Sequence, residues 1–489
     1  MKEKHILLIV LIIAIIAVSF MLLTSFTKSP DTIGYAIGSK YHPNIELKDS
    51  DGDGLKDFRE EVIGTDPSDS DSDNDGLLDS EEISYNTNPL NDDSDDDALS
   101  DGDEVKTYGS DPLNENSDDD CYSDYEEAIE YNTDPSDEDD YLHTLFATAI
   151  DGYIYALKAD DGSLLWTAST ELSSAKTHYT ITSSPAVDNC VVYFGGNDDY
   201  VYALNIKDGS EVWKHYIGSA IFSSPVIEDG VLYIGSHDKY VYALDADDGS
   251  ELWSFETGDY IFGKGTVYNG ILYIGSNDYY IYALDADDGT ERWSFKTDYK
   301  VRATPAVESF TEPISIFDET RIPLLNIYMY ELSLDDSLYA LNGYDGTEEW
   351  SMSLGTAQMI QSAVVEHGVL YIGSYDGYVY ALDAEDGSKI WDHKTEGHVI
   401  GTPTVSDGTL YISDEAYYVY AIDTSTGTRV WRSGPYSYYK FNHPPQVSDS
   451  LVFVNSYYND KIMALDKSTG IGKWVFTTGD DMYSALAYN

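Results

Sequence analysis

The chain has 489 residues and a formal net charge of −62, with 89 acidic side chains against 27 basic ones. Such an acidic chain is not expected to bind nucleic acid, because that requires basic patches that neutralise phosphates. The two cysteines, Cys121 and Cys190, predict no disulfide framework, and each is expected to be a free, partly buried thiol.

The N-terminus contains an uncharged apolar run, residues 6–26. As a helix it would be about 31 Å long, enough to cross a bilayer core of roughly 30 Å. Lys2 and Lys4 precede it, so the N-terminus is expected in the cytoplasm and the rest of the chain outside. Residues 1–27 are predicted to be a single-pass anchor in the cell membrane, or a signal segment cleaved near Ala17 that would leave a secreted protein. Residues 28–48 are a polar linker.

Residues 49–140 hold 36 acidic and three basic side chains. A disordered acidic run is one interpretation of that composition, but the spacing is regular. Four segments place oxygen-bearing side chains at positions 1, 3, 5, 9 and 12 of a calcium loop. The first two also have glycine at position 6, with the carbonyl of position 7 as a ligand; Ala98 and Cys121 replace that glycine in loops three and four, whose binding stays open. The predicted ligands are Asp49, Asp51, Asp53, Leu55, Asp57 and Glu60; Asp71, Asp73, Asp75, Leu77, Asp79 and Glu82; Asp93, Asp95, Asp97, Asp101 and Glu104; and Asn116, Asp118, Asp120, Asp124 and Glu127.

The segments between these loops do not resemble the helices of an EF-hand. A Thr/Ser-Asp/Asn-Pro triplet recurs at 65–67, 87–89, 110–112 and 133–135, where an apolar helix would be needed. The tract resembles thrombospondin type 3 repeats, with bacterial dockerins as a second relative that shares loop and spacing. The resemblance implies structural Ca²⁺ ions in place of a hydrophobic core, and a calcium-stiffened stalk over 49–140.

One phrase is repeated eight times in the rest of the chain and reads YVYALDADDGSELW at 240–253. Its copies end on Trp166, Trp213, Trp253, Trp293, Trp350, Trp391, Trp431 and Trp474, with spacings of 47, 40, 40, 57, 41, 40 and 43 residues. A period near forty, built from four short alternating strands with Asp-Gly turns, is typical of a β-propeller. We therefore predict an all-β fold over 141–489, an eight-bladed β-propeller.

The repeat also carries a family resemblance. Its pattern Ala-x-Asp-x-x-Thr-Gly-x-x-x-Trp resembles the tryptophan-docking motif of PQQ-type propellers, which include quinoprotein alcohol dehydrogenases and a bacterial outer-membrane assembly scaffold. Two blades match it in full, with Ala421, Asp423, Thr426, Gly427, Trp431 and with Ala464, Asp466, Thr469, Gly470, Trp474. The resemblance implies that each tryptophan packs against the next blade, so these residues are structural.

The two ends of the repeat region complement each other. The first copy lacks an opening strand, and residues 482–489 match one. A C-terminal strand that completes the first blade would close the ring and remove both free sheet edges. The long spacing of 57 residues predicts a surface-loop insertion near 309–325.

The opening strands are expected to line a central channel. The three residues before the proline-equivalent position of each strand run from Thr182–Ser184 in the second blade to Met482–Ser484 in the strand that closes the ring, and none of them is acidic. Without a carboxylate there is no general base of the dehydrogenase type and no calcium seat for a quinone, so we expect no pyrroloquinoline quinone. Lys264 and Arg302 are candidates to meet an anion or, alternatively, to pair with local acids; Gln361 and His443 are further channel candidates.

Two functions stay open at this point. The favoured one is a non-catalytic cell-surface protein whose stalk presents the propeller to another protein or to a cell-envelope polymer, in scaffolding, assembly or adhesion. The alternative is a quinoprotein dehydrogenase that oxidises alcohols or sugars at the cell surface. Fold alone does not decide between them.

Overall fold

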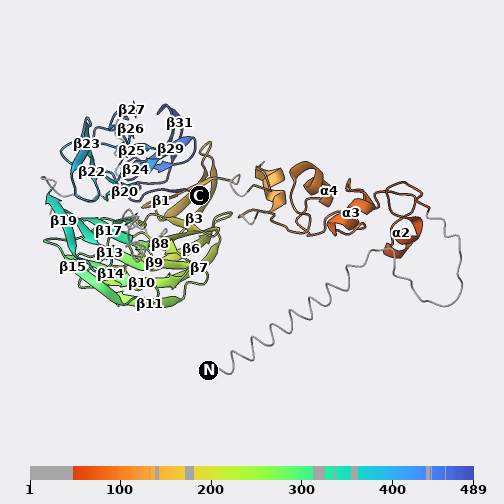
Figure 1. Cartoon of the computed structure of the whole chain (residues 1–489), viewed down its shortest axis with the longest axis horizontal. Helices are drawn as coiled ribbons and strands as arrows, with labels where there is room; N and C mark the ends of the chain where they lie inside the picture. Colours follow the sequence, from red (N-terminus) through yellow and green to blue (C-terminus); the bar gives the residue numbers. More distant parts are fainter. Residues whose placement is uncertain are drawn as a thin grey trace, which may run out of the picture. The chain divides into compact units, whose positions relative to one another are not determined.

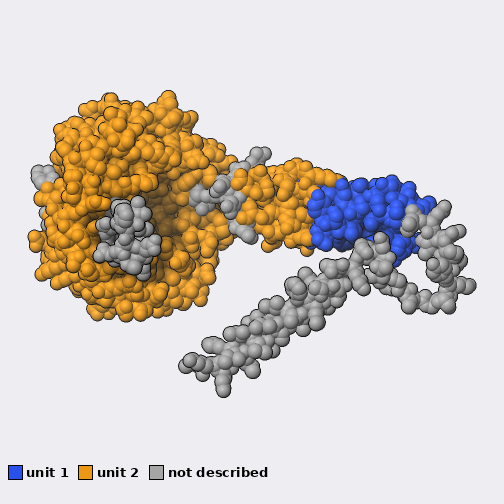
Figure 2. Space-filling model, viewed as in Figure 1, with its two compact units in different colours: residues 1–94, 100–103 blue, residues 95–99, 104–489 orange. Residues whose placement is uncertain are grey.

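The computed structural model describes residues 48–118, 121–131, 133–137, 142–170, 181–311, 325–334, 337–353, 362–436, 441, 443–456 and 459–488. The chain divides into two compact units, residues 1–94 with 100–103 and residues 95–99 with 104–489 (Figure 1; Figure 2). The predicted membrane segment, 6–26, lies outside the described residues. Within the described ranges, no helix is both long and apolar enough to cross a membrane.

Short helical turns begin within the predicted calcium loops, between positions 9 and 12. They are α2 (Asp57–Ile63), α3 (Asp79–Tyr85), α4 (Asp101–Asp103), η2 (Glu104–Tyr108) and η3 (Glu126–Tyr131). The first two end on a left-handed residue, Gly64 or Asn86, whose amide donates back to a carbonyl of the helix. Because Phe58 and Val62 of α2 are 54% and 75% exposed, this helix is not anchored by an apolar core.

The rest of the second unit folds into eight four-stranded antiparallel sheets, counted over the described residues and shown in Figure 1. Blades 1 to 4 consist of β1 (Thr144–Thr148), β2 (Tyr153–Lys158), β3 (Leu164–Ser169) and β32 (Ala487–Tyr488); β4 (Ala186–Asp188), β5 (Val191–Gly195), β6 (Tyr200–Asn205) and β7 (Glu211–Tyr216); β8 (Val226–Glu228), β9 (Val231–Gly235), β10 (Tyr240–Asp245) and β11 (Glu251–Glu256); and β12 (Thr266–Tyr268), β13 (Ile271–Gly275), β14 (Tyr280–Asp285) and β15 (Glu291–Lys296).

Blades 5 to 8 repeat this order. They consist of β16 (Ala306–Thr311), β17 (Leu325–Leu332), β18 (Ser337–Asn342) and β19 (Glu348–Ser353); β20 (Val364–Glu366), β21 (Val369–Gly373), β22 (Tyr378–Asp383) and β23 (Lys389–Lys394); β24 (Thr404–Ser406), β25 (Thr409–Ser413), β26 (Val419–Asp423) and β27 (Arg429–Ser433); and β28 (Gln446–Val447), β29 (Leu451–Asn455), β30 (Lys461–Asp466) and β31 (Gly472–Thr477). The predicted all-β eight-bladed propeller is confirmed.

The hydrophobic core lies between neighbouring blades. One cluster joins Tyr193 and Val201 of blade 2 to Leu232 and Ile234 of blade 3, and equivalent clusters recur around the ring. Alternation along each strand supplies apolar side chains to both faces of a sheet, and each face is covered by the next blade. The blades therefore depend on one another for burial.

Each tryptophan of the repeat joins one blade to the next. Trp213 donates its indole N–H to the carbonyl of Ala246 at 2.8 Å, and its ring packs on Gly249. Gly249 has a φ of +71°, and a Cβ on it would lie 2.6 Å from the indole ring. The same pair of contacts recurs for all eight tryptophans, ending with Trp474 on blade 1. The glycine of the motif is therefore needed for both its backbone conformation and its lack of a side chain.

The C-terminal strand closes the ring as predicted. β32 pairs with β1 through Leu145↔Tyr488 and Phe146↔Ala487. Met482 and Leu486 are buried with residues of blades 1 and 8, and the Tyr488 ring stacks on Phe453. Residues far apart in sequence thus supply one sheet.

The predicted insertion near 309–325 is only in part a loop. β16 and β17 run into it, and their ladder continues to the pair Thr311↔Leu325. This corrects the expectation of a surface loop over the whole segment, because the hairpin strands lengthen before the chain turns. Residues 312–324 lie outside the described residues.

One carboxyl group interrupts the apolar packing between blades 4 and 5. In the strand register, Glu331 takes the position that Ile234 and Ile274 hold in blades 3 and 4. Its side chain is 0% exposed, and neither oxygen has a hydrogen-bond partner in the described part of the chain. Burial raises the pKa of Glu331 well above its usual value. The folded state therefore favours the protonated form of this carboxyl group.

Deleting residues 482–489 should destabilise the propeller out of proportion to their number. The deletion removes buried Met482 and Leu486 and exposes the edge of β1, so we expect a loss of about 3–5 kcal/mol and aggregation on heating. Thermal unfolding of the full-length chain measures it, with removal of Asn489 alone as the control. Equal melting of both variants would show that the ring does not depend on this strand.

Replacing Glu331 by isoleucine should stabilise the protein, by about 1–3 kcal/mol for relief of an unsatisfied buried polar group. A raised folded-state pKa means that the wild type has its full contribution below the unfolded pKa and loses stability as pH rises. The advantage of Glu331→Ile should therefore grow from pH 5 to pH 8 in thermal melts. The reciprocal Ile234→Glu should destabilise with the same pH trend; pH-independent differences would contradict the assignment.

Candidate calcium loops and propeller channel

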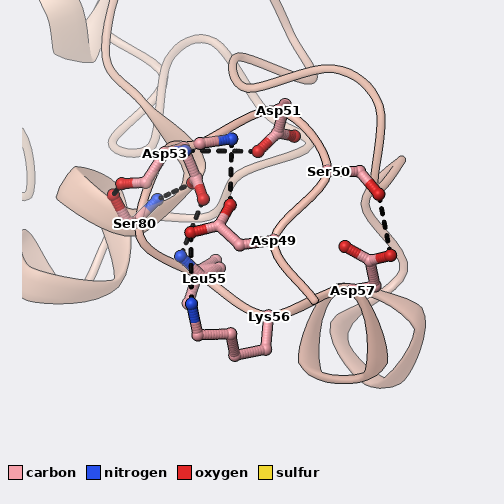
Figure 3. Close-up of polar contacts among 9 residues, drawn as sticks. Asp49, Ser50, Asp51, Asp53, Leu55, Lys56, Asp57 and Ser80 are labelled. Carbon is pink, nitrogen blue, oxygen red and sulfur yellow. Dashed lines mark hydrogen bonds and ion pairs between the residues drawn. The ribbon is translucent and has the colours of Figure 1, made fainter. Parts of the chain in front are cut away.

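Aspartates that bind backbone amides two residues ahead shape the first two loops. Asp51 accepts from the amide of Asp53 at 3.2 Å, and Asp53 accepts from Leu55 at 2.7 Å (Figure 3). Loop two repeats the pattern, with Asp75 accepting from Leu77 at 2.7 Å. Gly54 and Gly76 have φ values of +108° and +102°, a backbone conformation that favours glycine at position 6 of the turn.

These turns bring the predicted ligand atoms together. Carboxylate oxygens of Asp49, Asp51 and Asp53 lie within 4.8 Å of one another, and so do those of Asp71, Asp73 and Asp75. Glu60 and Glu82, at position 12, are 0% exposed, and neither carboxylate has a hydrogen-bond partner among the described residues.

The chemistry of this donor set fits a hard divalent cation. Burial and the neighbouring aspartates raise the pKa of Glu60 to about 7 and that of Glu82 to about 8, which reflects carboxylates held together without a counter-charge. Calcium accepts six to eight oxygen ligands at flexible geometry and would supply the missing charge. In a Ca²⁺-bound loop, the side chains at positions 1, 3, 5 and 12 would hold the ion. The carbonyl of Leu55 or Leu77 would add a further oxygen ligand.

The position-9 aspartates also have a second task. Asp79 accepts from both the amide and the hydroxyl of Ser72, at 2.8 Å each. Asp57 accepts from the hydroxyl of Ser50 at 2.8 Å, while its other oxygen is buried without a partner among the described residues. These bonds tie the start of each helix to position 2 of its own loop.

The position-5 aspartates connect each repeat to the next. Asp53 accepts from the amide of Ser80, at the start of α3, at 3.0 Å, and the Ser80 hydroxyl donates to the Asp53 carbonyl at 2.7 Å (Figure 3). Asp75 likewise accepts from Gly102 at 2.7 Å, and Asp97 from Tyr125 at 2.9 Å. In each case the donor is position 10 of the following loop. One carboxylate therefore shapes its own loop and holds the first turn of the next repeat.

Gly102 shows how close this contact is. A Cβ at this position would overlap the carbonyl oxygen of Asp75 and stand 2.8 Å from its carbonyl carbon. Its φ is not positive, so space rather than backbone conformation requires the glycine.

The third and fourth loops depart from this pattern. Asp93 and Asp101 belong to the first compact unit, whereas Asp95, Asp97 and Glu104 belong to the second, so the loop is not described as a single site. Ala98 replaces the glycine but keeps a φ of +83°. In loop four, Asp124 accepts from the Ser117 amide and hydroxyl at 2.8 and 2.7 Å, and Glu127 is buried and accepts from Thr133 at 3.1 Å. Asn116 and Asp118 each bury one side-chain oxygen, and Asp120 lies outside the described residues.

Both cysteines form a disulfide, which corrects the prediction of two free thiols. Cys121, at position 6 of loop four, is bonded to Cys190 in the turn between β4 and β5. Lys207 of blade 2 pairs with Glu126 and lies over the Tyr122 ring at 5.2 Å. The residue that breaks the calcium-loop pattern is therefore the one that fastens this repeat to the propeller.

The opening strands of neighbouring blades contact one another around a closed ring, and Figure 2 shows the propeller hollowed at its centre. The strand register confirms the predicted channel alignment in every described blade except at the last strand. There Ala487 is equivalent to Ala186, so the three residues are Tyr483, Ser484 and Ala485 rather than Met482–Ser484. The error arose because no proline marks this strand. Met482 is instead buried, as Ile221 is in blade 3.

The channel candidates differ in charge and setting. Arg302 is half-buried, donates to the Asn277 side chain at 2.8 Å and lies over the Phe262 ring at 4.2 Å. Burial lowers the pKa of His443 to about 4, so this ring is neutral, and Asn455 contacts it at 3.3 Å. Lys264 is half-buried, and burial lowers its pKa. Gln361 lies outside the described residues.

Carboxylates do occur on the opening strands, beyond the three predicted positions. Asp188, Glu228, Glu308 and Glu366 are the equivalent residues of β4, β8, β16 and β20, four residues after the Lys264 level. At 3.3 Å per residue this is about 13 Å further along the strand. Extending the sequence alignment by four positions would have found them.

The loops and the ring of blades define a β-propeller protein preceded by acidic loop repeats. A sequence model of the family described as outer membrane protein assembly factor BamB matches residues 150–266 and 334–437. A model described as bacterial TSP3 repeat matches 49–70, 71–92 and 93–115. The chain thus carries BamB-like propeller repeats preceded by bacterial TSP3 repeats, as the sequence resemblances indicated.

Known relatives share short segments with this chain. The proteins named outer membrane protein assembly factor BamB from Salmonella typhimurium and Escherichia coli are 37% identical over 73 residues, covering 13% of this chain and 19% of each relative. The match therefore spans about a fifth of their length. Among solved structures, a quinohemoprotein alcohol dehydrogenase from Pseudomonas putida has a TM-score of 0.53 at 15% identity over 66% of this chain and 68% of that one. The designed Ika8 protein has the same score and identity, over 63% and 91%. These likenesses show the fold alone.

Replacing Gly102 by alanine should weaken calcium binding in loop two, although Gly102 is no ligand of that loop. The added methyl group would push the third repeat away from Asp75, at a cost of about 1–3 kcal/mol. Limited proteolysis of the full-length chain, in chelator and then across a calcium titration, measures the ordering of residues 48–118. We expect protection by calcium in the wild type and a shift to higher calcium in Gly102→Ala.

Gly472→Ala is the matched control, because a Cβ there meets no atom within 4 Å. Equal protease sensitivity of the wild type with and without calcium would contradict the calcium assignment. Identical titrations of both variants would contradict the coupling between repeats.

Proposed function

We propose that this protein is exported and anchored by residues 6–26, and that its calcium-ordered repeats present a non-catalytic propeller to another protein or to a cell-envelope polymer. Ca²⁺ is the structural ion of the repeats in this proposal. The protein would be a scaffold or assembly factor outside the cytoplasm.

The disulfide between Cys121 and Cys190 is the observation that carries the proposal. Disulfides persist in oxidising compartments outside the cytoplasm. Extracellular calcium modules typically bind at about 10⁻⁴–10⁻³ M, so they too suit a calcium-rich exterior. The bond closes 69 residues of chain and would contribute about 4 kcal/mol by restricting the unfolded state. Because this disulfide joins the last repeat covalently to the propeller, it suits a spacer that has to keep the propeller attached.

The propeller itself supports binding rather than catalysis. The BamB-named relatives are assembly factors by name, which favours a role in protein contacts. At the channel positions described near Lys264, the side chains are hydroxyl, apolar or cationic rather than carboxylate. A quinoprotein dehydrogenase would need a carboxylate base beside its cofactor. That alternative keeps its support from the fold shared with the Pseudomonas putida enzyme.

A turnover assay separates the two functions. Full-length chain incubated with pyrroloquinoline quinone and calcium should show no dye-linked oxidation of primary alcohols or sugars, because the described channel positions near Lys264 hold no carboxylate to remove the substrate proton. A working quinoprotein dehydrogenase run in parallel controls for the cofactor and dye. Dye reduction that requires both the quinone and this chain would overturn the non-catalytic assignment.

A further inference from the structure

A cavity of about 410 Å³ opens between blades 3 and 4, beside the turns that join β8 to β9 and β12 to β13. Aliphatic side chains and carboxylates line it together. They are Val231, Leu252 and Val267, and Glu228, Asp229 and Asp287. A ligand in this cavity would therefore meet apolar surface and negative charge side by side.

The three carboxylates gather around one tyrosine. Burial raises the pKa of Tyr233 to about 12, and the charges of Asp287, Asp229 and Glu228 add to the shift. No described basic side chain forms an ion pair with any of these three carboxylates. Because like charges repel, a cation would be stabilised among them.

The equivalent crevice between blades 7 and 8 already contains a cation. Lys467 of blade 8 donates to the Asp407 carboxylate of blade 7 at 2.7 Å and to the Ser406 hydroxyl at 3.3 Å. The Lys467 side chain is only 13% exposed, although Asp407 is 79% exposed. The crevice therefore covers the aliphatic stem of a lysine while the ammonium group reaches the acid at its edge.

The two crevices are built from equivalent positions. Asp229 and Asp407 each follow the opening strand of their blade, with φ values of 49° and 51°. Ala286 and Lys467 each accept a bond at their backbone carbonyl from the motif tryptophan of the preceding blade, at 2.9 and 2.8 Å. Ala286 lines the cavity between blades 3 and 4, so the cavity lies where blade 8 places its lysine side chain.

The cavity differs from its filled counterpart in two respects. Ala286 lacks the side chain with which Lys467 fills the other crevice. Glu228 stands where blade 7 has Ser406, and so adds a second carboxylate. The acids are thus present in the crevice between blades 3 and 4, and the cation that they would pair with is missing from the chain itself.

A second cavity, of about 450 Å³ between blades 6 and 7, has a different charge. His367 takes the position of Asp229 there, and its ring nitrogen lies 4.0 Å from the Glu366 carboxylate. Thr424 takes the position of Ala286 and donates to the Gly408 carbonyl at 2.9 Å. An open crevice between blades is therefore not always strongly acidic, and the combination at blades 3 and 4 is specific to that pair.

We propose that the cavity between blades 3 and 4 binds a lysine side chain of a partner protein. The ammonium group would pair with Asp229 and Glu228, as Lys467 pairs with Asp407, and the stem would lie against Leu252. This inference rests on the proposed function as a protein-binding propeller and names the group of the partner that is recognised. A metal ion would gain nothing from the aliphatic walls, whereas the methylene groups of lysine bury against them.

The test uses the full-length chain in millimolar calcium at constant ionic strength. The probe is a glycine-lysine-glycine tripeptide with both ends blocked, titrated and followed by saturation-transfer NMR. We expect saturable binding, with the strongest transfer to the δ and ε methylene protons of the lysine, because these would contact the cavity wall. The same peptide with an acetylated lysine should bind about tenfold more weakly, since it has lost the charge.

Three variants localise the site. Asp229→Asn should weaken binding about threefold or more, and asparagine tolerates the positive φ of this turn. Glu251→Gln is the matched control, because Glu251 is an exposed acid of the same blade outside the cavity lining, and it should bind as the wild type does. Ala286→Lys should abolish peptide binding and raise the melting temperature, because it recreates the contact that Lys467 makes.

Absence of saturable binding, or equal affinity in Asp229→Asn and the wild type, would overturn the proposal. Tighter binding of free cadaverine than of the peptide would identify a small amine as the occupant, and loss of peptide binding on adding more calcium would identify a metal site; either result also overturns it. Because this experiment involves no quinone, its failure would leave the non-catalytic assignment to the dye-reduction assay.

Discussion

The contact between each tryptophan and the glycine of the next blade is the constraint on which the propeller depends. A single sheet has two apolar faces, and only its neighbours cover them. The indole ring fits against a glycine in the left-handed conformation and bonds to a carbonyl three residues before it, as Trp253 does with Gly289 and Ala286. Because the contact passes from blade to blade, Trp474 must find Gly162 of blade 1 for the set to be complete. The C-terminal strand stabilises that closure because it covers the free edge of β1.

The loop repeats have few apolar side chains to bury, with Leu55, Leu77, Leu99 and Tyr122 buried among the described residues. In the proposed calcium-bound state, their order depends on carboxylates that repel one another until a cation neutralises them. The position-5 aspartates link the repeats, because Asp53 and Asp75 each also accept a hydrogen bond from a backbone amide of the following repeat. Gly102 provides the space for that contact. In the proposed calcium-bound state, ordering of one loop therefore favours the correct placement of the next.

Features that recur along the chain were predicted from the sequence, whereas features that depend on a single long-range contact were missed. The tryptophan motif predicted the blades, and the loop spacing predicted the carboxylate clusters of Asp49–Asp53 and Asp71–Asp75, because each feature is local and recurs. The partner of Cys121 was invisible, since Cys190 lies 69 residues away and comes near only through folding. Glu331 carried a signal that a blade-by-blade alignment would show, an acid where Ile234 and Ile274 stand. The one-residue error in the alignment at Met482 arose because the C-terminal strand is too short and too irregular to align.

Uncompensated charge is treated in two ways in this chain. In the acidic loops it is repeated many times with one sign, and the proposed Ca²⁺ ions would neutralise it. Glu331 shows the other solution, because its buried carboxyl group has no hydrogen-bond partner among the described residues and its raised pKa favours the protonated form.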